Sequence, residues 1–241
     1  MNRIQYSGVR VQFSGFRVQY LGAVISILRN KLALTINKLA FLAGTDPVAI
    51  ARELIGVELV TMVGGVETAV RITETEAYWA PDDRASHAFG NKRTKRTEVF
   101  FHQPGTSYVY LCYGIHEMFN VVTGPEGTAH AILIRAGEPS RGLEHIMKRR
   151  NIETLTPQLS SGPGVLTKAL GIDRKLNGHN LLLPDGTVRL EVTGPKVPAS
   201  QIVATPRIGI GYAGAPWVNK PWRFYRKDST FVSRLNAFKE R

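Results

Sequence analysis

The sequence contains little cysteine and little acid for its length, and both shortages limit what the protein can be. One cysteine among 241 residues excludes an internal disulfide and a cysteine-rich zinc site. This composition suits a reducing compartment, so we expect a cytoplasmic protein. The six histidines are scattered along the chain and indicate no metal cluster, so we expect neither a metal nor another cofactor.

The shortage of acid leaves a large excess of positive charge. Asp and Glu number 19 against 31 Lys and Arg, which gives a net charge of +12 and an isoelectric point near 10.0. Such a surface attracts polyanions, with nucleic acid the first choice and an anionic membrane the second. The hydrophobic fraction of 43% and the charged fraction of 21% are ordinary for a globular protein, and the length allows a substantial core.

The first 36 residues differ from the rest, and we expect them to form an N-terminal extension. Residues 6–20 form a short tandem repeat, and the apolar residues 21–28 are followed at once by Arg29, Asn30 and Lys31. This pattern fits neither a signal peptide nor a membrane helix, which needs roughly 20 uninterrupted apolar residues. A basic arm, a poorly ordered extension and a translation start placed too far upstream are the alternatives. No linker divides the remainder, so we expect one domain over residues 37–241.

An alternating stretch from Arg71 to Tyr78 predicts a β-strand with two carboxylates on one face. Because side chains two apart in a strand share a face, Glu74, Glu76 and Tyr78 are expected to lie together. Acids in such positions are commonly solvated or paired with Lys or Arg. Here Tyr78 and Trp79 suggest the wall of a cavity, where an acid is a candidate general base.

A basic segment and a second strand follow. The segment NKRTKR, residues 91–96, holds four cations and is either a solvated loop or a contact for nucleic acid. Residues 106–113 predict a strand that ends in a hairpin turn at Tyr113 and Gly114. Tyrosines in strands usually pack in the core, but a tyrosine at a hairpin tip beside a basic loop can wedge between bases.

The remaining patterns predict helices and further strands, so the fold class is α+β with mostly antiparallel pairing. Asp46 and Pro47 are typical of a helix start, and helices are also expected over residues 141–150 and after the glycine-rich turn at Ser160. That turn either binds phosphate or is an ordinary helix cap. Further strands are expected over residues 57–62, 66–76, 129–135 and, on either side of a turn at 184–186, within 177–192.

Two motifs point to other enzyme classes but fail on their context. Residues 209–214 have the glycine spacing of a dinucleotide-binding fingerprint, yet no helix pattern follows them. His116 and Glu117 begin a zinc-protease motif, but its fifth position is Asn120 instead of histidine. Neither activity is therefore expected.

Five motifs follow one another in the middle of the chain. They are ETEAY at residues 74–78, P-x-D-x-A-S-H at 81–87, R-T-x-R at 93–96, PGTSYVYLCYGIHEMFNVV at 104–122 and ILIRAGEP at 132–139. In order and spacing they resemble the alkyladenine (3-methyladenine) DNA glycosylase family. The resemblance covers about residues 41–233. It implies a single compact α+β domain around a curved, mostly antiparallel β-sheet, with a protruding DNA-binding β-hairpin.

The resemblance also implies which residues perform catalysis. Glu76 would be the general base that activates water, and Arg135 would orient that water and touch phosphate. Glu74 would be structural and paired with a cation, and a carbonyl near Ile208 would help to hold the water. Such chemistry requires the nucleotide to leave the duplex first. The bond between the base and the sugar then breaks by way of a transition state in which the sugar resembles a cation.

Recognition of the base and of DNA is implied in the same way. The flipped base would stack on Tyr78 on one side and on His87 and Tyr110 on the other, and Asn120 would exclude guanine through its 2-amino group. The backbone near His87 would read the base edge. The residues implied to bind DNA are Tyr113, which would intercalate in the minor groove, and Lys92, Arg93, Arg96, Gly164 and Lys168.

The function that the resemblance implies is hydrolysis of damaged purines from double-stranded DNA in base excision repair. Such an enzyme would associate with the nucleoid if the source is prokaryotic. Its substrates would be 3-methyladenine, 7-methylguanine, ethenoadenine and hypoxanthine, although no second acid to protonate hypoxanthine stands out. No lysine occupies an obvious nucleophile position, so we expect a monofunctional enzyme, and we expect a monomer. Lys95, Thr97 and Val165 depart from the family pattern of proline, asparagine and lysine at these positions.

Three rival interpretations remain. The first is a nucleic-acid-binding module without chemistry, which would be indifferent to substitution of Glu76. The second is a hydrolase of free nucleosides or glycosides, against which the net charge of +12 argues. The third is a membrane-associated protein that uses the basic and apolar residues 1–36.

Overall fold

A computed structural model describes residue 26, residues 29–30 and residues 32–233. The tandem repeat at residues 6–20 and most of the expected N-terminal extension lie outside the described residues. Residues 32–38 are helical and lead into a short 3-10 helix, η1 (Ala40–Ala43). Leu39 and Leu42 of this segment are buried in the core, so the folded unit includes them.

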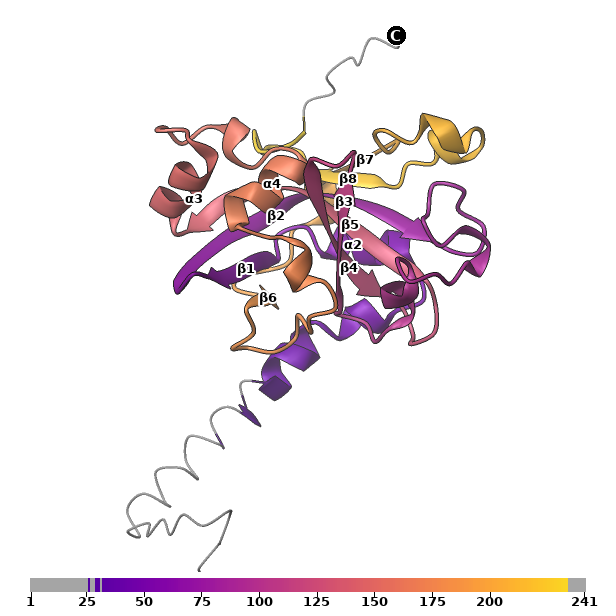
Figure 1. The fold of residues 1–241 in the computed structure, drawn as a ribbon, viewed down its shortest axis with the longest axis horizontal. Coiled ribbons are helices and arrows are strands. Elements are labelled where there is room, and N and C mark those ends of the chain that lie inside the picture. Colours follow the sequence, from indigo (N-terminus) through magenta and orange to yellow (C-terminus); the bar gives the residue numbers. More distant parts are fainter. Residues whose placement is uncertain (1–25, 27–28, 31, 234–241) are drawn as a thin grey trace, which may run out of the picture.

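The described residues form one compact α+β domain around an eight-stranded antiparallel sheet (Figure 1). The strands are β1 (Glu58–Val63), β2 (Val66–Trp79), β3 (Ser107–Cys112), β4 (His116–Thr123), β5 (His130–Arg141), β6 (Val188–Glu191), β7 (Ile202–Thr205) and β8 (Arg223–Arg226). Their order is β3-β4-β5-β2-β1-β6, and β8 pairs with both β2 and β7. The predicted fold class is confirmed.

The central strand β2 changes partners along one edge, and this change lies at the two carboxylates. Residues 66–71 of β2 pair with β1, whereas residues 74–76 pair with β8. Its other edge pairs with β5 from Ala69 to Trp79, with register shifts on both sides of Glu74. Such bulges bend a strand and re-aim its side chains. Residues 72–77 of β2 are fully buried.

The sheet contains two tight β-hairpins, β1–β2 and β3–β4. Gly64 and Gly65 both have positive φ and join β1 to β2, which is the geometry of a two-residue turn with the twist of the strands. Cys112 pairs with His116 across the second turn, so Tyr113 lies at its tip, with a φ of 51°. That this hairpin enters DNA stays a prediction.

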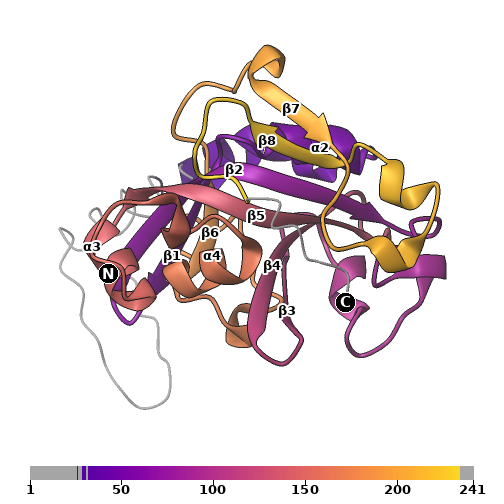
Figure 2. The same ribbon diagram turned by 90° about the horizontal axis from the view of Figure 1, so that it is seen from above.

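The helices are α2 (Pro47–Glu53), α3 (Leu143–Arg150) and α4 (Pro163–Leu170). Asp46 caps α2 as predicted, because its side chain accepts hydrogen bonds from the amides of Val48 at 2.8 Å and Ala49 at 3.2 Å. The short 3-10 helices after η1 are η2 (Phe89–Asn91), η3 (Glu98–Phe101), η4 (Pro157–Leu159), η5 (Arg174–Leu176), η6 (Ala199–Gln201), η7 (Gly211–Ala213) and η8 (Trp217–Asn219). Figure 2 shows α2 on one face of the β2–β5 pair and α4 on the other. Within the described part of the chain, no helix has the length and apolar character to cross a bilayer.

Two predicted elements need correction. Helix α3 starts at residue 143, whereas the predicted helix started at residue 141. The difference arises because Arg141 ends β5 and Gly142 takes a left-handed conformation, with a φ of 64°. Of the strands predicted within residues 177–192, only β6 forms. Residues 177–183 are irregular because the side chain of Asn180 accepts a hydrogen bond from the amide of Leu182 and closes a local turn.

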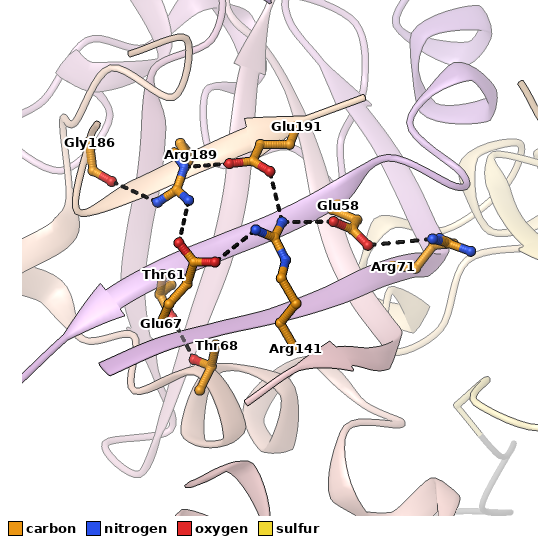
Figure 3. A network of polar contacts seen from close by, with 9 residues as sticks. All are labelled: Glu58, Thr61, Glu67, Thr68, Arg71, Arg141, Gly186, Arg189 and Glu191. Atoms are coloured by element: carbon orange, nitrogen blue, oxygen red, sulfur yellow. Dashed lines mark hydrogen bonds and ion pairs between the residues drawn. The ribbon is translucent and has the colours of Figure 1, made fainter. Parts of the chain in front are cut away.

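An ion-pair network covers the surface of the sheet where β1, β2, β5 and β6 meet (Figure 3). Three glutamates and three arginines alternate within it: Glu58, Glu67, Arg71, Arg141, Arg189 and Glu191. Arg189 reaches Glu67 at 2.6 Å and Glu191 at 2.7 Å, so the network ties the short strand β6 to the long hairpin beside it. Its charges balance, so this surface does not contribute to the net charge.

Candidate active site

Most of the predicted site residues line one cavity of about 1020 Å³. It lies between the β3–β4 hairpin, β5, the start of α4 and the loops around residues 85 and 210. The predicted residues that line it are Tyr78, His87, Arg96, Tyr110, Tyr113, Asn120, Arg135 and Gly164. A second hollow of about 760 Å³ along α3 has no aromatic wall.

Four predicted residues do not line this cavity: Glu76, Lys92, Arg93 and Lys168. Glu76 is fully buried directly behind the wall formed by Tyr78, Arg135 and Ile208, each of which is bonded to it. Lys92 and Lys168 are exposed on the surface. Arg93 pairs with Glu98 at 3.6 Å, and both of their side chains are more than half exposed.

The two carboxylates of β2 share one arginine. Arg135 donates from Nε to Glu74 Oε1 at 2.9 Å and from Nη1 to Glu76 Oε2 at 3.2 Å. Arg223 also donates to Glu74 Oε1, at 2.6 Å, and the amide of Ser233 donates to Glu74 Oε2 at 2.5 Å. The predicted pairing of Glu74 with a cation is confirmed. Burial alone would lower the pKa of Arg135, but the charges of Glu76 and Glu74 outweigh it and raise that pKa above its usual value.

Glu76 keeps acceptor capacity on one oxygen. Its Oε2 accepts from Arg135 and from the Tyr78 hydroxyl at 2.8 Å, whereas among the described residues its Oε1 accepts only from the amide of Ile208, at 2.7 Å. A carboxylate has about four lone-pair positions, so one remains on Oε1 for a further donor such as water. The backbone group at Ile208 that contacts Glu76 is therefore the amide, where a carbonyl acting on the water was predicted.

The Tyr78 ring is fixed from behind. Its hydroxyl donates to Glu76, and the guanidinium of Arg207 lies over its ring at 4.6 Å from the centroid. Burial, together with the charge of Glu76, raises the pKa of the Tyr78 phenol well above its usual value, so the hydroxyl stays a donor at neutral pH. The ring of Tyr78 is thus held in one orientation at the wall of the cavity.

His87 belongs to an aromatic cluster with Tyr108 and Tyr110. The rings of His87 and Tyr110 meet edge to face at 4.6 Å, and Tyr110 stacks on Tyr108 at 5.3 Å. Arg96 lies over Tyr110 at 5.0 Å and places Nη2 at 3.3 Å from Nε2 of His87. Since arginine can only donate, Nε2 must accept, and Nδ1 carries the proton that it donates to the Tyr108 hydroxyl at 3.1 Å.

His87 is therefore a neutral ring. Burial and the charge of Arg96 lower its pKa to about 4. At neutral pH the ring presents a flat, uncharged surface and has no acidic proton to transfer. It can stack on a base but cannot act as a general acid.

Asn120 and the hairpin occupy other walls of the cavity. The side chain of Asn120 is 4% exposed, and its Nδ2 donates to the carbonyl of Tyr108 at 3.1 Å, which settles the orientation of its amide. Tyr113 is 91% exposed and Ile115 is 73% exposed at the tip. An apolar tip in solvent is unusual in a protein that folds alone and is typical of a contact surface.

The start of α4 lies against the hairpin. A methyl group on Gly164 would lie 2.8 Å from the ring of His116, so only glycine allows this approach. Gly162, which precedes the helix, provides no side-chain cap. The first amides of α4 therefore remain available to an anion, which favours phosphate contact over plain capping for this predicted site.

Several residues that build the site were not predicted. Arg207, Arg223, Asp83 and Tyr108 hold the predicted residues in place, and the two arginines come from distant parts of the chain. Arg207 follows a proline and precedes Ile208, but a single arginine in a loop has no distinguishing pattern. Among the described residues, no group of histidine, cysteine or acidic side chains could hold a metal ion.

Comparison with known proteins shows the family of the chain. A family model described as methylpurine-DNA glycosylase matches residues 40–230. A protein of Bacillus cereus strain G9842 is 45% identical over 197 residues, which cover 78% of this chain and 95% of that protein. A protein of Natranaerobius thermophilus is 42% identical over 189 residues, covering 78% and 94%. Each bears the name "Putative 3-methyladenine DNA glycosylase".

Proposed function

The chain belongs to the methylpurine-DNA glycosylase family and is a DNA N-glycosylase, and from this premise we propose how its cavity selects and releases a base. A damaged purine leaves the duplex, enters the cavity and loses its bond to deoxyribose by hydrolysis. The observation that supports this most is a buried carboxylate, Glu76, with one free acceptor position directly behind the cavity wall that contains the Tyr78 ring.

Glu76 is the general base of this proposal. A water that donates to its Oε1 loses a proton to the carboxylate as it attacks the sugar carbon, and the same charge stabilises the cation-like sugar. Arg135 has the role of orienting Glu76, because it bonds Oε2 and leaves Oε1 to the water. No step needs a metal.

The base is held by stacking. Tyr78, His87 and Tyr110 all line the cavity, and a stacked base gains about 1–3 kcal/mol per aromatic contact. Asn120, with its amide orientation fixed, stands at the base edge and excludes the 2-amino group of guanine. Cationic bases such as 3-methyladenine and 7-methylguanine leave without protonation, but 7-methylguanine keeps the 2-amino group that Asn120 opposes and is therefore released more slowly than 3-methyladenine. Neutral ethenoadenine and hypoxanthine need a proton that neutral His87 does not supply, so they react more slowly.

The surface around the cavity fits the minor groove of duplex DNA. Tyr113 at the hairpin tip fills the gap that the base leaves, while Arg96, Lys92, Arg93, Lys168 and the start of α4 meet phosphates. No lysine is among the described residues that line the cavity. A covalent imine with the sugar is therefore not formed, and the enzyme is monofunctional.

The test is a set of duplexes that each carry one 3-methyladenine analogue, 7-methylguanine, ethenoadenine or hypoxanthine. We expect the free base and an intact abasic strand, with faster release from the cationic bases. Strand cleavage at the abasic site would contradict the monofunctional assignment. Release from free nucleosides at a comparable rate would favour the rival hydrolase instead.

A further inference from the structure

A buried ion pair supports the wall of the cavity, and neither of its residues is among the proposed catalytic groups. Arg207 and Asp83 have side chains with 0% exposure, and they form two hydrogen bonds, Nη1 to Oδ2 at 2.6 Å and Nη2 to Oδ1 at 2.8 Å. This is the two-pronged pairing that only arginine makes with a carboxylate. The residues are 124 positions apart in the chain.

One end of this pair holds Tyr78. The guanidinium of Arg207 lies over the Tyr78 ring at 4.6 Å and over the Trp222 ring at 4.9 Å. Its Nη1 also donates to the carbonyl of Ala77 at 2.8 Å, the residue before Tyr78. The arginine therefore fixes the backbone and the ring of this wall together.

The other end holds the loop that carries His87. Oδ1 of Asp83 accepts a hydrogen bond from the amide of Ala85 at 3.0 Å, and the carbonyl of Asp83 accepts from the amide of Ser86 at 2.9 Å. These bonds close the turn directly before His87. The residue after Arg207 is Ile208, whose amide holds Glu76 at 2.7 Å.

We propose that Arg207 is a positioning residue that sets the stacking surfaces of the flipped base, and the general base behind them, relative to one another through Asp83. It touches neither the base nor the water. Its planar fork links Tyr78, the turn before His87 and the amide on Glu76, and these three otherwise belong to separate segments. The inference rests on the proposed function, because the spacing of the stacking surfaces matters only if a planar base enters the cavity.

Arg207→Lys is the variant that tests this, since lysine keeps the charge and loses the fork and the flat stacking surface. Arg189→Lys is the matched control. Arg189 is also a nearly buried arginine, with 8% side-chain exposure and two carboxylate partners, but it belongs to the remote network of Figure 3. Any general effect of losing a buried arginine appears in both variants.

The measurements are single-turnover base release and the ratio of affinities for ethenoadenine and undamaged duplexes, taken below the unfolding temperature of each variant. For Arg207→Lys we expect release to slow by about 10- to 100-fold relative to Arg189→Lys, the loss typical of a displacement on the order of 1 Å. The lesion-to-undamaged ratio should fall, while affinity for undamaged DNA stays within about twofold. If Arg207→Lys does not fold, Asp83→Asn replaces it, and the same measurements are compared with those on Arg189→Lys.

Equal release rates and equal ratios in the two lysine variants would overturn the inference, because a purely structural arginine affects both alike. A wild-type chain that releases no base contradicts the proposed function alone, since the lesion-to-undamaged ratio still reports on the stacking surfaces. A wild type that shows no preference for the lesion would overturn the inference as well.

Discussion

Replacing Glu74 with glutamine should destabilise the protein far more than an ordinary loss of an ion pair. Glu74 is fully buried and accepts from Arg135, Arg223 and the amide of Ser233. Glutamine is neutral, so Arg223 loses its carboxylate partner and Arg135 keeps only Glu76. Its amide also replaces one acceptor oxygen by a donor, which then faces either the arginines or the Ser233 amide.

The magnitude follows from the burial. Removing one partner of a buried ion pair leaves an uncompensated charge and costs about 3–5 kcal/mol. For a domain of roughly 200 residues each kcal/mol lowers the melting temperature by about 2–4 °C. We therefore expect Glu74→Gln to melt roughly 6–20 °C below the wild type.

Thermal and denaturant unfolding of Glu74→Gln and Glu67→Gln provide the comparison. Glu67 also lies between two arginines, with Arg141 at 2.7 Å and Arg189 at 2.6 Å, but its side chain is 33% exposed. Solvent offsets the loss there, so we expect about 1 kcal/mol or less. Equal destabilisation by the two substitutions would refute the assignment of Glu74 as the buried charge that holds the site together.

Three further predictions address pH, the hairpin tip and salt. The pKa of His87 is about 4 in the folded state against 6.5 in the unfolded state, so the unfolded state binds more protons between these values. The free energy of unfolding should therefore fall by at most about 3 kcal/mol as the pH drops from 6.5 to 4, and His87→Gln should flatten this slope in denaturant titrations. Tyr113→Ser should leave the melting temperature unchanged, because the side chain is 91% exposed, and should weaken lesion binding by about 10-fold or more, measured by fluorescence anisotropy; unchanged lesion binding would exclude its intercalation. Lys168→Ala should reduce the slope of log affinity against log salt by about 0.9 if this residue meets a phosphate, and an unchanged slope would remove it from the interface.

Local sequence patterns were sufficient for the segments that carry the chemistry. Alternation along β2 predicted that Glu74, Glu76 and Tyr78 share a face, and the structure confirms it. Arg135 bonds both acids on that face, while Thr75 donates to the carbonyl of Ala51 in α2. The glycine after Tyr113 likewise identified the hairpin tip, because a turn needs residues that accept positive φ.

The contacts that hold these segments were beyond such patterns. Arg207 and Arg223 reach the site from strands and loops more than 120 residues away, and nothing in their local sequence distinguishes them from surface arginines. The strand predicted at residues 177–183 was wrong for a local reason. The apolar residues 181–183 favour a strand, but Asn180 closes a turn on its own backbone and forms an isolated bridge to Thr106, just before β3.

The most direct test of the account compares wild type with Glu76→Gln on one ethenoadenine duplex, measuring binding and single-turnover release separately. The amide keeps the shape of the carboxylate but cannot take a proton from water. The account predicts that release falls by at least about 100-fold while binding of the lesion duplex remains, because general base catalysis contributes about 10²–10⁴-fold. Release by Glu76→Gln at the wild-type rate would contradict the role of Glu76 and with it the central claim.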